Sequence, residues 1–170
     1  DPEALYEITM KLDGSSATFF HRDGEVGVCS RNLQLKVNDE NKDNTFVRML
    51  HDSGLVFALP QLGNIAIQGE LMGPGIQGNR DQLKRHQLYI FDVQNLDTGE
   101  YLSPFERHRL MDKLTNLGVN TAGLVFHVPV LTGHGFDTNV GPEDSVLWKL
   151  HELRLNSIDD LLGFADGKSI

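Results

Sequence analysis

Apolar and polar residues alternate in several short segments of the chain, and a period of two is typical of half-buried β-strands. The first segment covers residues 6–12, in which Lys11 falls on the polar side and should face away from the core. Residues 17–22 and 25–30 flank Asp23-Gly24, a dipeptide that favours a two-residue hairpin turn. The pattern therefore predicts three antiparallel strands in this first part of the chain.

Helical spacing follows in two places, where apolar residues recur every three or four positions. The first helix should follow the polar loop 38–44 and end at Gly54. The second should begin at Ser103, which forms a capping-box pattern with Glu106, and should end at Gly118.

The remaining segments complete an α+β pattern. Strands are expected at 65–71 and 87–93, with Glu70 on the face opposite the isoleucines of its strand. A short edge strand is expected at 128–131, because proline cannot donate to a β-ladder. Two further helices are expected at 144–153 and 158–165. We therefore expect one α+β domain over residues 1–170, with mainly antiparallel sheets and flanking helices.

Composition narrows the class of protein. The chain has 170 residues, of which 39% are hydrophobic, and this is enough for one substantial core. No apolar run approaches the roughly 18 residues of a membrane span, so we expect a soluble, intracellular protein. The net charge of -9 argues against a broad cationic surface for nucleic acid. For the single cysteine, Cys29, packing in a strand is the favoured interpretation and redox chemistry the alternative.

Three segments carry candidate chemistry. Lys11-Leu12-Asp13-Gly14 presents an amine beside a tight turn, although such a turn is more often plain solvated surface. Glu70 precedes a glycine-rich loop that lets backbone approach a ligand, and a flexible hairpin connection is the alternative. Tyr89 and Phe91 share one face of a strand, where an aromatic pair usually belongs to the core.

Taken in order, these segments resemble the early motifs of the covalent nucleotidyltransferases, which include ATP-dependent DNA and RNA ligases and mRNA capping enzymes. The resemblance covers nearly the whole chain, and the run from Gly69 to Asn79 is similar to RNA ligases that seal nicks in duplexes. It implies the ATP-grasp-like adenylation domain of these ligases. The matching segments are Lys11-Leu12-Asp13-Gly14, Ser30-Arg31-Asn32, Gly69-Glu70, Gly73-Pro74-Gly75-Ile76-Gln77, Asn79, Tyr89-Ile90-Phe91-Asp92, Tyr101-Leu102-Ser103-Pro104, His127-Val128-Pro129-Val130-Leu131 and Gly167-Lys168-Ser169.

The resemblance implies a reaction through lysyl-AMP. Lys11 would attack the α-phosphate of ATP and release pyrophosphate, with Mg²⁺ or Mn²⁺ neutralising the phosphates. AMP would then pass to a 5′-phosphate end, and a neighbouring 3′-hydroxyl would displace it at a nick in an RNA-containing duplex. Asp13 would orient the lysine or hold a metal-bound water, and the backbone of Leu12 would contact the adenine edge.

The other site residues are also assigned by the resemblance. Arg31 would contact the nucleotide or the strand end, and Glu70 the ribose hydroxyls. Phe91 would stack on adenine, unless Tyr89 on the same face takes that place. No residue is assigned as a direct metal ligand.

Three cations in one loop form a candidate patch for nucleic-acid phosphates: Arg80, Lys84 and Arg85. A solvated hairpin tip is an equally good interpretation of this loop. The expected partners are ATP and a nicked RNA-containing duplex, and the expected oligomeric state is a monomer.

The chain departs from the family pattern toward its end. The family's later motifs, an acid-Gly-x-Val strand and a strand with paired lysines, have no counterpart after Gly123-Leu124-Val125-Phe126, where Ala122 stands in place of the acid. We therefore expect a fragment of a longer enzyme, incomplete at the C-terminus and without an N-terminal module, that is a poor catalyst by itself. DNA ligase, capping guanylyltransferase and a non-catalytic nucleotide- or nucleic-acid-binding module are the alternatives.

Overall fold

The computed structural model describes Glu7 and residues 9–130. The chain divides into two compact units, one formed by Asp13–His127 and the other by Asp1–Leu12 with Val128–Ile170. No helix in this described part of the chain is both long and apolar enough to cross a membrane.

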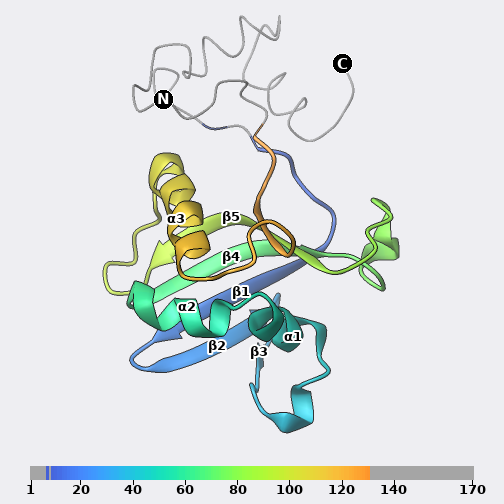
Figure 1. The fold of residues 1–170 in the computed structure, drawn as a ribbon, viewed down its shortest axis with the longest axis horizontal. Coiled ribbons are helices and arrows are strands. Elements are labelled where there is room, and N and C mark those ends of the chain that lie inside the picture. The colour runs from blue at the N-terminus through green and yellow to red at the C-terminus, as the bar shows by residue number, and fades with distance from the viewer. Residues whose placement is uncertain (1–6, 8, 131–170) are drawn as a thin grey trace, which may run out of the picture. The chain divides into compact units, whose positions relative to one another are not determined.

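A mixed sheet organises the unit Asp13–His127. Among the described residues it has six strands, in the order β3-β2-β1-β4-β5-β6 (Figure 1). Neighbouring strands are antiparallel except for β5 and β6, which are parallel. The mainly antiparallel α+β prediction is therefore confirmed. The strands are β1 (Ser15–Arg22), β2 (Glu25–Ser30), β3 (Gln34–Leu35), β4 (Ile65–Met72), β5 (Gln87–Asn95) and β6 (Val125–His127).

The first hairpin forms at the predicted turn. Arg22 pairs with Glu25, which leaves Asp23 and Gly24 as a two-residue loop. Both loop residues have positive φ, 50° and 89°, as a type I′ turn requires. Cys29 lies in β2 as expected, and burial raises the pKa of its thiol, which favours packing over reactivity.

Two of the four predicted helices fall among the described residues, and both form. The side chain of Asn44 caps α1 by accepting from the N–H of Phe46, and Ser103 and Glu106 form the capping box of α3. Four short helical segments, η1, α2, η2 and η3, were not predicted, because three or four residues are too few to show a helical period. The helices are η1 (Asp39–Asn41), α1 (Thr45–Asp52), α2 (Leu55–Ala58), η2 (Leu59–Leu62), η3 (Gln77–Asn79) and α3 (Pro104–Asn116).

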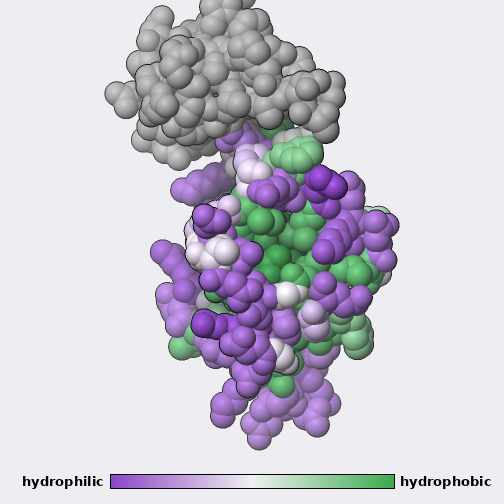
Figure 2. Space-filling view, turned by 90° about the vertical axis from the view of Figure 1, so that its left-hand side faces the viewer, coloured by the Kyte–Doolittle hydropathy of each residue, from purple (hydrophilic) through white to green (hydrophobic). Residues whose placement is uncertain are grey.

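The sheet has one face in the core and one face that stays partly open. Helices α1 and α2 lie across the core face in front of β1 and β2 (Figure 1), where Phe19 and Ile67 are fully buried. Leu114 brings α3 into the same core. Alternate strand positions, among them Gln68 and Glu70, are only half-buried. Figure 2 shows, on one side of this unit, apolar surface in a hollow framed by polar residues.

Two strand predictions need correction. Among the described residues 9–12, Thr9 makes only an isolated bridge to Val130, and the N–H of Met10 donates to the carbonyl of Pro129 at 2.8 Å. Residues 128–130 form no strand. The physical reason is that Pro129 has no N–H to donate to a β-ladder. The nearby strand is instead β6, which pairs in parallel with β5. The helices predicted at 144–153 and 158–165 lie outside the described residues.

Candidate active site at the end of the sheet

The carboxylate of Glu70 is bound to the turn that precedes β1. The N–H of Gly14 donates a hydrogen bond to Oε1 of Glu70 at 2.8 Å, across 56 positions of sequence. In the sheet, Glu70 of β4 lies between two paired residues, Ser16 of β1 on one side and Tyr89 of β5 on the other. Two motifs that are far apart in the sequence therefore meet at one end of the sheet.

Gly14 leaves no room for a side chain at this meeting point. A Cβ atom placed there would lie 2.5 Å from the carbonyl oxygen of Leu71 and 3.0 Å from Cγ of Glu70. The first of these distances involves backbone, which cannot move aside without disturbing the pairing of β1 with β4. Glycine at this position therefore permits the close approach that the hydrogen bond to Glu70 needs.

Asp13 is joined to the loop between β4 and β5. Its Oδ2 lies 3.0 Å from Nη1 of Arg80, and the two side chains are 56% and 79% exposed. Within the loop, the side-chain amide of Asn79 bonds both the N–H and the carbonyl of Leu83 at 3.0 Å. Arg80 thus forms a solvent-exposed ion pair with Asp13, which brings this loop cation next to the turn before β1.

Two aromatic residues of β5 have different surroundings. The ring of Tyr89 stacks on Phe126 of β6, with centroids 5.4 Å apart and planes at 25°. The pairing of β4 with β5 shifts register between Gln68 and Gly69, which leaves Phe91 as the extra residue of a β-bulge. A bulge redirects its side chain and is common beside functional sites. Phe91 is half-buried.

The other predicted site residues are distributed over both units. Arg31 is exposed and follows β2 directly. Lys11 and Leu12 belong to the unit of Asp1–Leu12 with Val128–Ile170, in which Lys11 is exposed and Leu12 half-buried. Direct contacts in the larger unit therefore join Asp13 to Arg80 and Gly14 to Glu70. Phe91 lies in β5 of its sheet, and Arg31 comes directly after β2.

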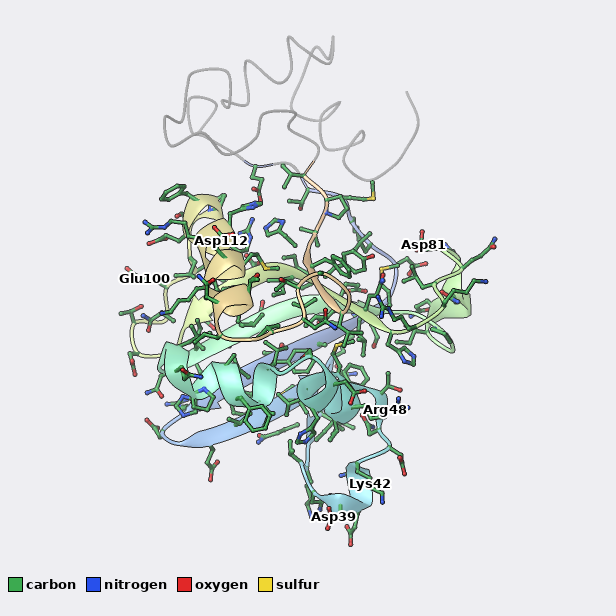
Figure 3. The ribbon with its side chains drawn as sticks, in the orientation of Figure 1. Asp39, Lys42, Arg48, Asp81, Glu100 and Asp112 are labelled. Carbon is green, nitrogen blue, oxygen red and sulfur yellow. The ribbon has the colours of Figure 1, made fainter. Side chains whose placement is uncertain are left out.

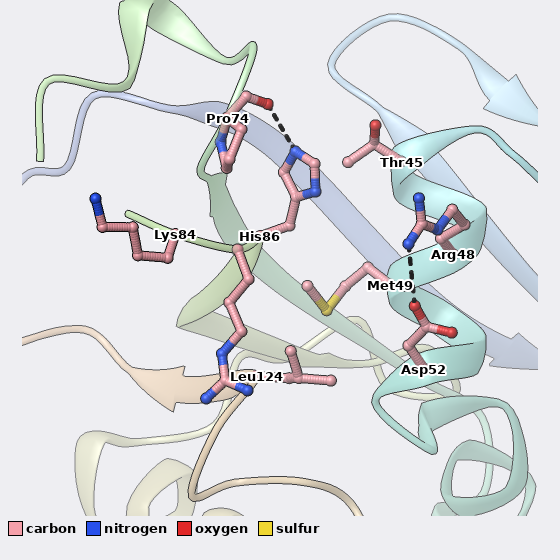
Figure 4. A pocket seen from close by; sticks show the side chains of 9 residues that line it. Thr45, Arg48, Met49, Asp52, Pro74, Lys84, His86 and Leu124 are labelled. Atoms are coloured by element: carbon pink, nitrogen blue, oxygen red, sulfur yellow. Dashed lines mark hydrogen bonds and ion pairs between the residues drawn. The ribbon is translucent and has the colours of Figure 1, made fainter. Parts of the chain in front are cut away.

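Lys84 and Arg85 line a pocket, which the sequence did not predict. The pocket has a volume of about 410 Å³, and its opposite wall is α1, with Arg48 and Asp52 (Figure 4). The one available sequence signal was the spacing of Arg48 and Asp52, which places both side chains on one face of a helix.

A buried arginine links α3 to the sheet, and sequence reasoning also missed it. Arg107 is only 6% exposed. Its Nη1 lies 3.7 Å from Oδ1 of Asp92, and its Nε donates a hydrogen bond to Nε2 of His127 at 2.9 Å. Burial raises the pKa of Asp92, and the charge of Arg107 opposes that shift. Burial lowers the pKa of His108 to about 4; Arg107 adds to this shift and Asp112 opposes it.

Comparison with known proteins identifies the family. The model of the RNA ligase family matches residues 5–155. Solved structures of the Naegleria gruberi RNA ligase match with TM-scores of 0.67 for a mutant with ATP and Mn, 0.66 for the enzyme with PPi, and 0.69 for a mutant with AMP and Mn. Their sequence identities to this chain are 38%, 38% and 35%. A comparison with curated proteins found no match.

The matches also show what share of the related enzyme's length corresponds to this chain. They cover 74%, 74% and 84% of this chain but only 35%, 35% and 40% of the Naegleria enzyme. The sheet, its flanking helices and these matches define a nucleotidyltransferase domain. The chain belongs to the RNA ligase family.

Proposed function

We propose that the protein is an ATP-dependent RNA ligase that works through AMP bound covalently to Lys11. Family membership supports this, as do related structures that contain ATP, AMP or PPi. Within the chain, the observation that carries the proposal is the hydrogen bond from Gly14 to Glu70. It fixes the turn that follows Lys11 in the sequence against the strand that presents the candidate ribose ligand.

The proposed reaction consists of three displacements at phosphorus. In the first, Nζ of neutral Lys11 attacks the α-phosphorus of ATP, a P–N bond forms, and pyrophosphate leaves. In the second, an oxygen of the RNA 5′-phosphate attacks the same phosphorus, and the lysine amine leaves. In the third, a 3′-hydroxyl attacks the activated 5′-phosphate, and AMP leaves as the phosphodiester forms. Positioning and charge stabilisation supply most of the catalysis in such steps.

Glu70 and Phe91 are assigned to the nucleoside. Glu70 would accept hydrogen bonds from the ribose hydroxyls, since its carboxylate is half-buried at the open face of the sheet. Phe126 covers one side of the Tyr89 ring, which favours Phe91 as the residue that stacks on adenine. Leu12 is assigned to the adenine edge through its backbone, by resemblance to the family.

Asp13 and Arg31 are assigned to the phosphates of the substrates and to the divalent ion that accompanies them. Mg²⁺ and Mn²⁺ prefer oxygen ligands, and the exposed carboxylate of Asp13 could hold a water bound to such an ion or orient Lys11. Its contact with Arg80 is an exposed ion pair, which a ligand can displace at little cost in free energy. A divalent ion would neutralise the phosphates. Arg31 would contact the nucleotide or the RNA end.

The proposed substrate is a nick in an RNA-containing duplex, and a sealing assay tests it. Three nicked duplexes are compared, with RNA on both sides of the nick, RNA on the 3′-hydroxyl side only, or DNA throughout. Each is incubated with the protein, ATP and Mg²⁺, and the strands are separated under denaturing conditions. We expect sealing of the RNA-containing nicks and a pyrophosphate product. Sealing of the all-DNA nick alone, or sealing that needs GTP in place of ATP, would contradict the proposal.

A further inference from the structure

A second candidate binding site lies away from the open face of the sheet. The pocket of about 410 Å³ is formed between α1 and the connection from β4 to β5 (Figure 4). Helix α1 covers the core face of the sheet, whereas Glu70 and Tyr89 belong to the opposite face. The pocket is therefore distinct from the proposed nucleotide site. Its volume falls within the range of pockets that bind small ligands, about 300–1,000 Å³.

The charge of the pocket differs from that of the whole chain. Its lining includes three cations, Arg48, Lys84 and Arg85, and one carboxylate, Asp52. The chain as a whole carries a net charge of -9, and its exposed acidic residues are spread over separate elements (Figure 3). A concave cluster of cations on an acidic protein attracts anions at one place and repels them elsewhere.

The cations in the pocket are available to a ligand. Nη2 of Arg48 lies 3.9 Å from Oδ2 of Asp52, and both side chains are more than half exposed, at 59% and 58%. Such a pair is weak and can exchange for a phosphate. On the other wall, Nε2 of His86 lies 2.8 Å from the carbonyl oxygen of Pro74, which holds the ring in the pocket lining (Figure 4).

Apolar residues also line the pocket, so a bare anion would not use its whole surface. Met49 is 4% exposed, and Leu124 is half-buried beside it in the lining. A ligand that combines a phosphate with a flat or apolar portion would use both kinds of surface. A nucleotide has this combination, because every base has an apolar face that can pack on side chains.

We infer that this pocket binds one nucleotide of the RNA strand. Arg48 and Arg85 contact its phosphate, and Lys84 adds positive charge to the lining. Met49 and Leu124 pack against its sugar and base. The inference rests on the proposed RNA ligase function for the identity of the strand. The lining of the pocket by itself indicates the class of ligand, which is a phosphate ester with an apolar portion. It also gives separate roles to the loop cations, since Arg80 pairs with Asp13, whereas Lys84 and Arg85 line the pocket.

Fluorescence anisotropy with a labelled single-stranded RNA tests the inference. The full chain is compared with Arg48→Gln, Arg85→Gln and Asp52→Asn, and with Lys113→Gln on α3 as the matched control. We expect the two arginine variants to bind roughly threefold to tenfold more weakly. The slope of log affinity against log salt should also fall by about 0.7 for each lost phosphate contact.

Asp52→Asn provides a test with the opposite sign. It removes the pocket's one carboxylate, so RNA binding should become tighter, whereas a purely structural role for this exposed residue would leave binding unchanged or weaker. The inference is overturned if Asp52→Asn does not bind more tightly, or if Arg48→Gln and Arg85→Gln bind RNA as well as Lys113→Gln does.

Competition distinguishes the RNA strand from a free nucleotide. Excess AMP or inorganic phosphate should displace the labelled RNA far less effectively than unlabelled RNA does. Equal displacement by AMP would assign the pocket to a free nucleotide and overturn the inference. The same preparations are incubated with α-labelled ATP. Because lysyl-AMP formation needs no RNA, a missing AMP adduct counts against the ligase chemistry, while unchanged RNA binding in the pocket variants counts against the pocket.

Discussion

Gly14 and Glu70 are joined by a hydrogen bond of 2.8 Å between the backbone N–H of one and Oε1 of the other. The contact connects the turn at the start of β1 with the last part of β4. A half-buried carboxylate that accepts a backbone N–H stays in one orientation. Glu70 therefore has a structural role in addition to the ribose contact proposed for it.

The first prediction separates these two roles of Glu70. Glu70→Gln keeps an acceptor oxygen for Gly14, whereas Glu70→Ala removes it and leaves the N–H without that partner. We expect Glu70→Ala to lower the free energy of unfolding by about 1–2 kcal/mol, and Glu70→Gln by less than half as much. Urea denaturation measures both, with exposed Glu100→Ala as control. Equal stability of the three variants would exclude the structural role.

The second prediction concerns the ion pair of Asp13 and Arg80. Because both side chains are more than half exposed, solvent screens their interaction. A double-mutant cycle with Asp13→Asn and Arg80→Gln should give a coupling free energy below about 1 kcal/mol, which disappears at high salt. A larger, salt-independent coupling would mean that the loop is locked to Asp13, and a metal ion or phosphate could not displace Arg80 easily.

The third prediction compares two arginines of α3. Arg107 is buried against Asp92 and His127, whereas Arg109 is exposed and its guanidinium lies 5.7 Å from the ring centre of Phe105. Arg107→Gln should lower the free energy of unfolding by about 1–3 kcal/mol, since it removes the hydrogen bond to His127 and the ion pair with Asp92 that a buried side chain makes. Arg109→Gln should cost less than about 1 kcal/mol. Similar losses in thermal and urea denaturation would show that Arg107 is not the anchor of the helix.

The fourth prediction is a pH dependence that comes from His108. Burial lowers its pKa to about 4 in the folded protein, below the ordinary value of 6.5, so the unfolded chain binds the extra proton first. This contribution to stability is complete above about pH 6.5 and is lost as the pH falls toward 4. The loss should be about 1–2 kcal/mol, because the ring is only partly buried.

Substitution isolates the contribution of this histidine. His108→Gln should flatten the dependence of the unfolding free energy on pH between about pH 7 and pH 5, relative to the unsubstituted protein. Urea denaturation at both pH values gives the comparison. If His108→Gln and the unsubstituted protein lose equal stability on acidification, other groups cause the effect.

The parts of the fold that the sequence predicts well are those with a local cause. The Asp23-Gly24 turn and the capping box of Ser103 and Glu106 depend on neighbouring residues, and both form as expected. β6 has three residues and lies one position before a proline-containing segment, so periodicity alone could not locate it. Its parallel pairing with β5 depends on a long connection through α3.

The residues of the candidate sites also fall into two groups, those that sequence motifs name and those that only the tertiary structure reveals. Glu70 and Phe91 are named by resemblance to the family's motifs, and their proposed roles stay predictions. The burial of Arg107 could not be predicted, since its partners Asp92 and His127 are 15 or more positions away. The pocket of Arg48 requires three separate segments to meet, which only the tertiary structure reveals.

Covalent attachment of AMP to Lys11 is the central claim, and mass spectrometry of the intact protein tests it most directly. The protein is incubated with ATP and Mg²⁺, in parallel with Lys11→Ala and with Lys36→Ala, another exposed lysine, as control. The account predicts a mass increase of one adenylyl group, that is AMP less one water, even at low yield, in the unsubstituted protein and in Lys36→Ala but not in Lys11→Ala. An adduct that persists in Lys11→Ala, or no adduct in any of the three, would contradict it.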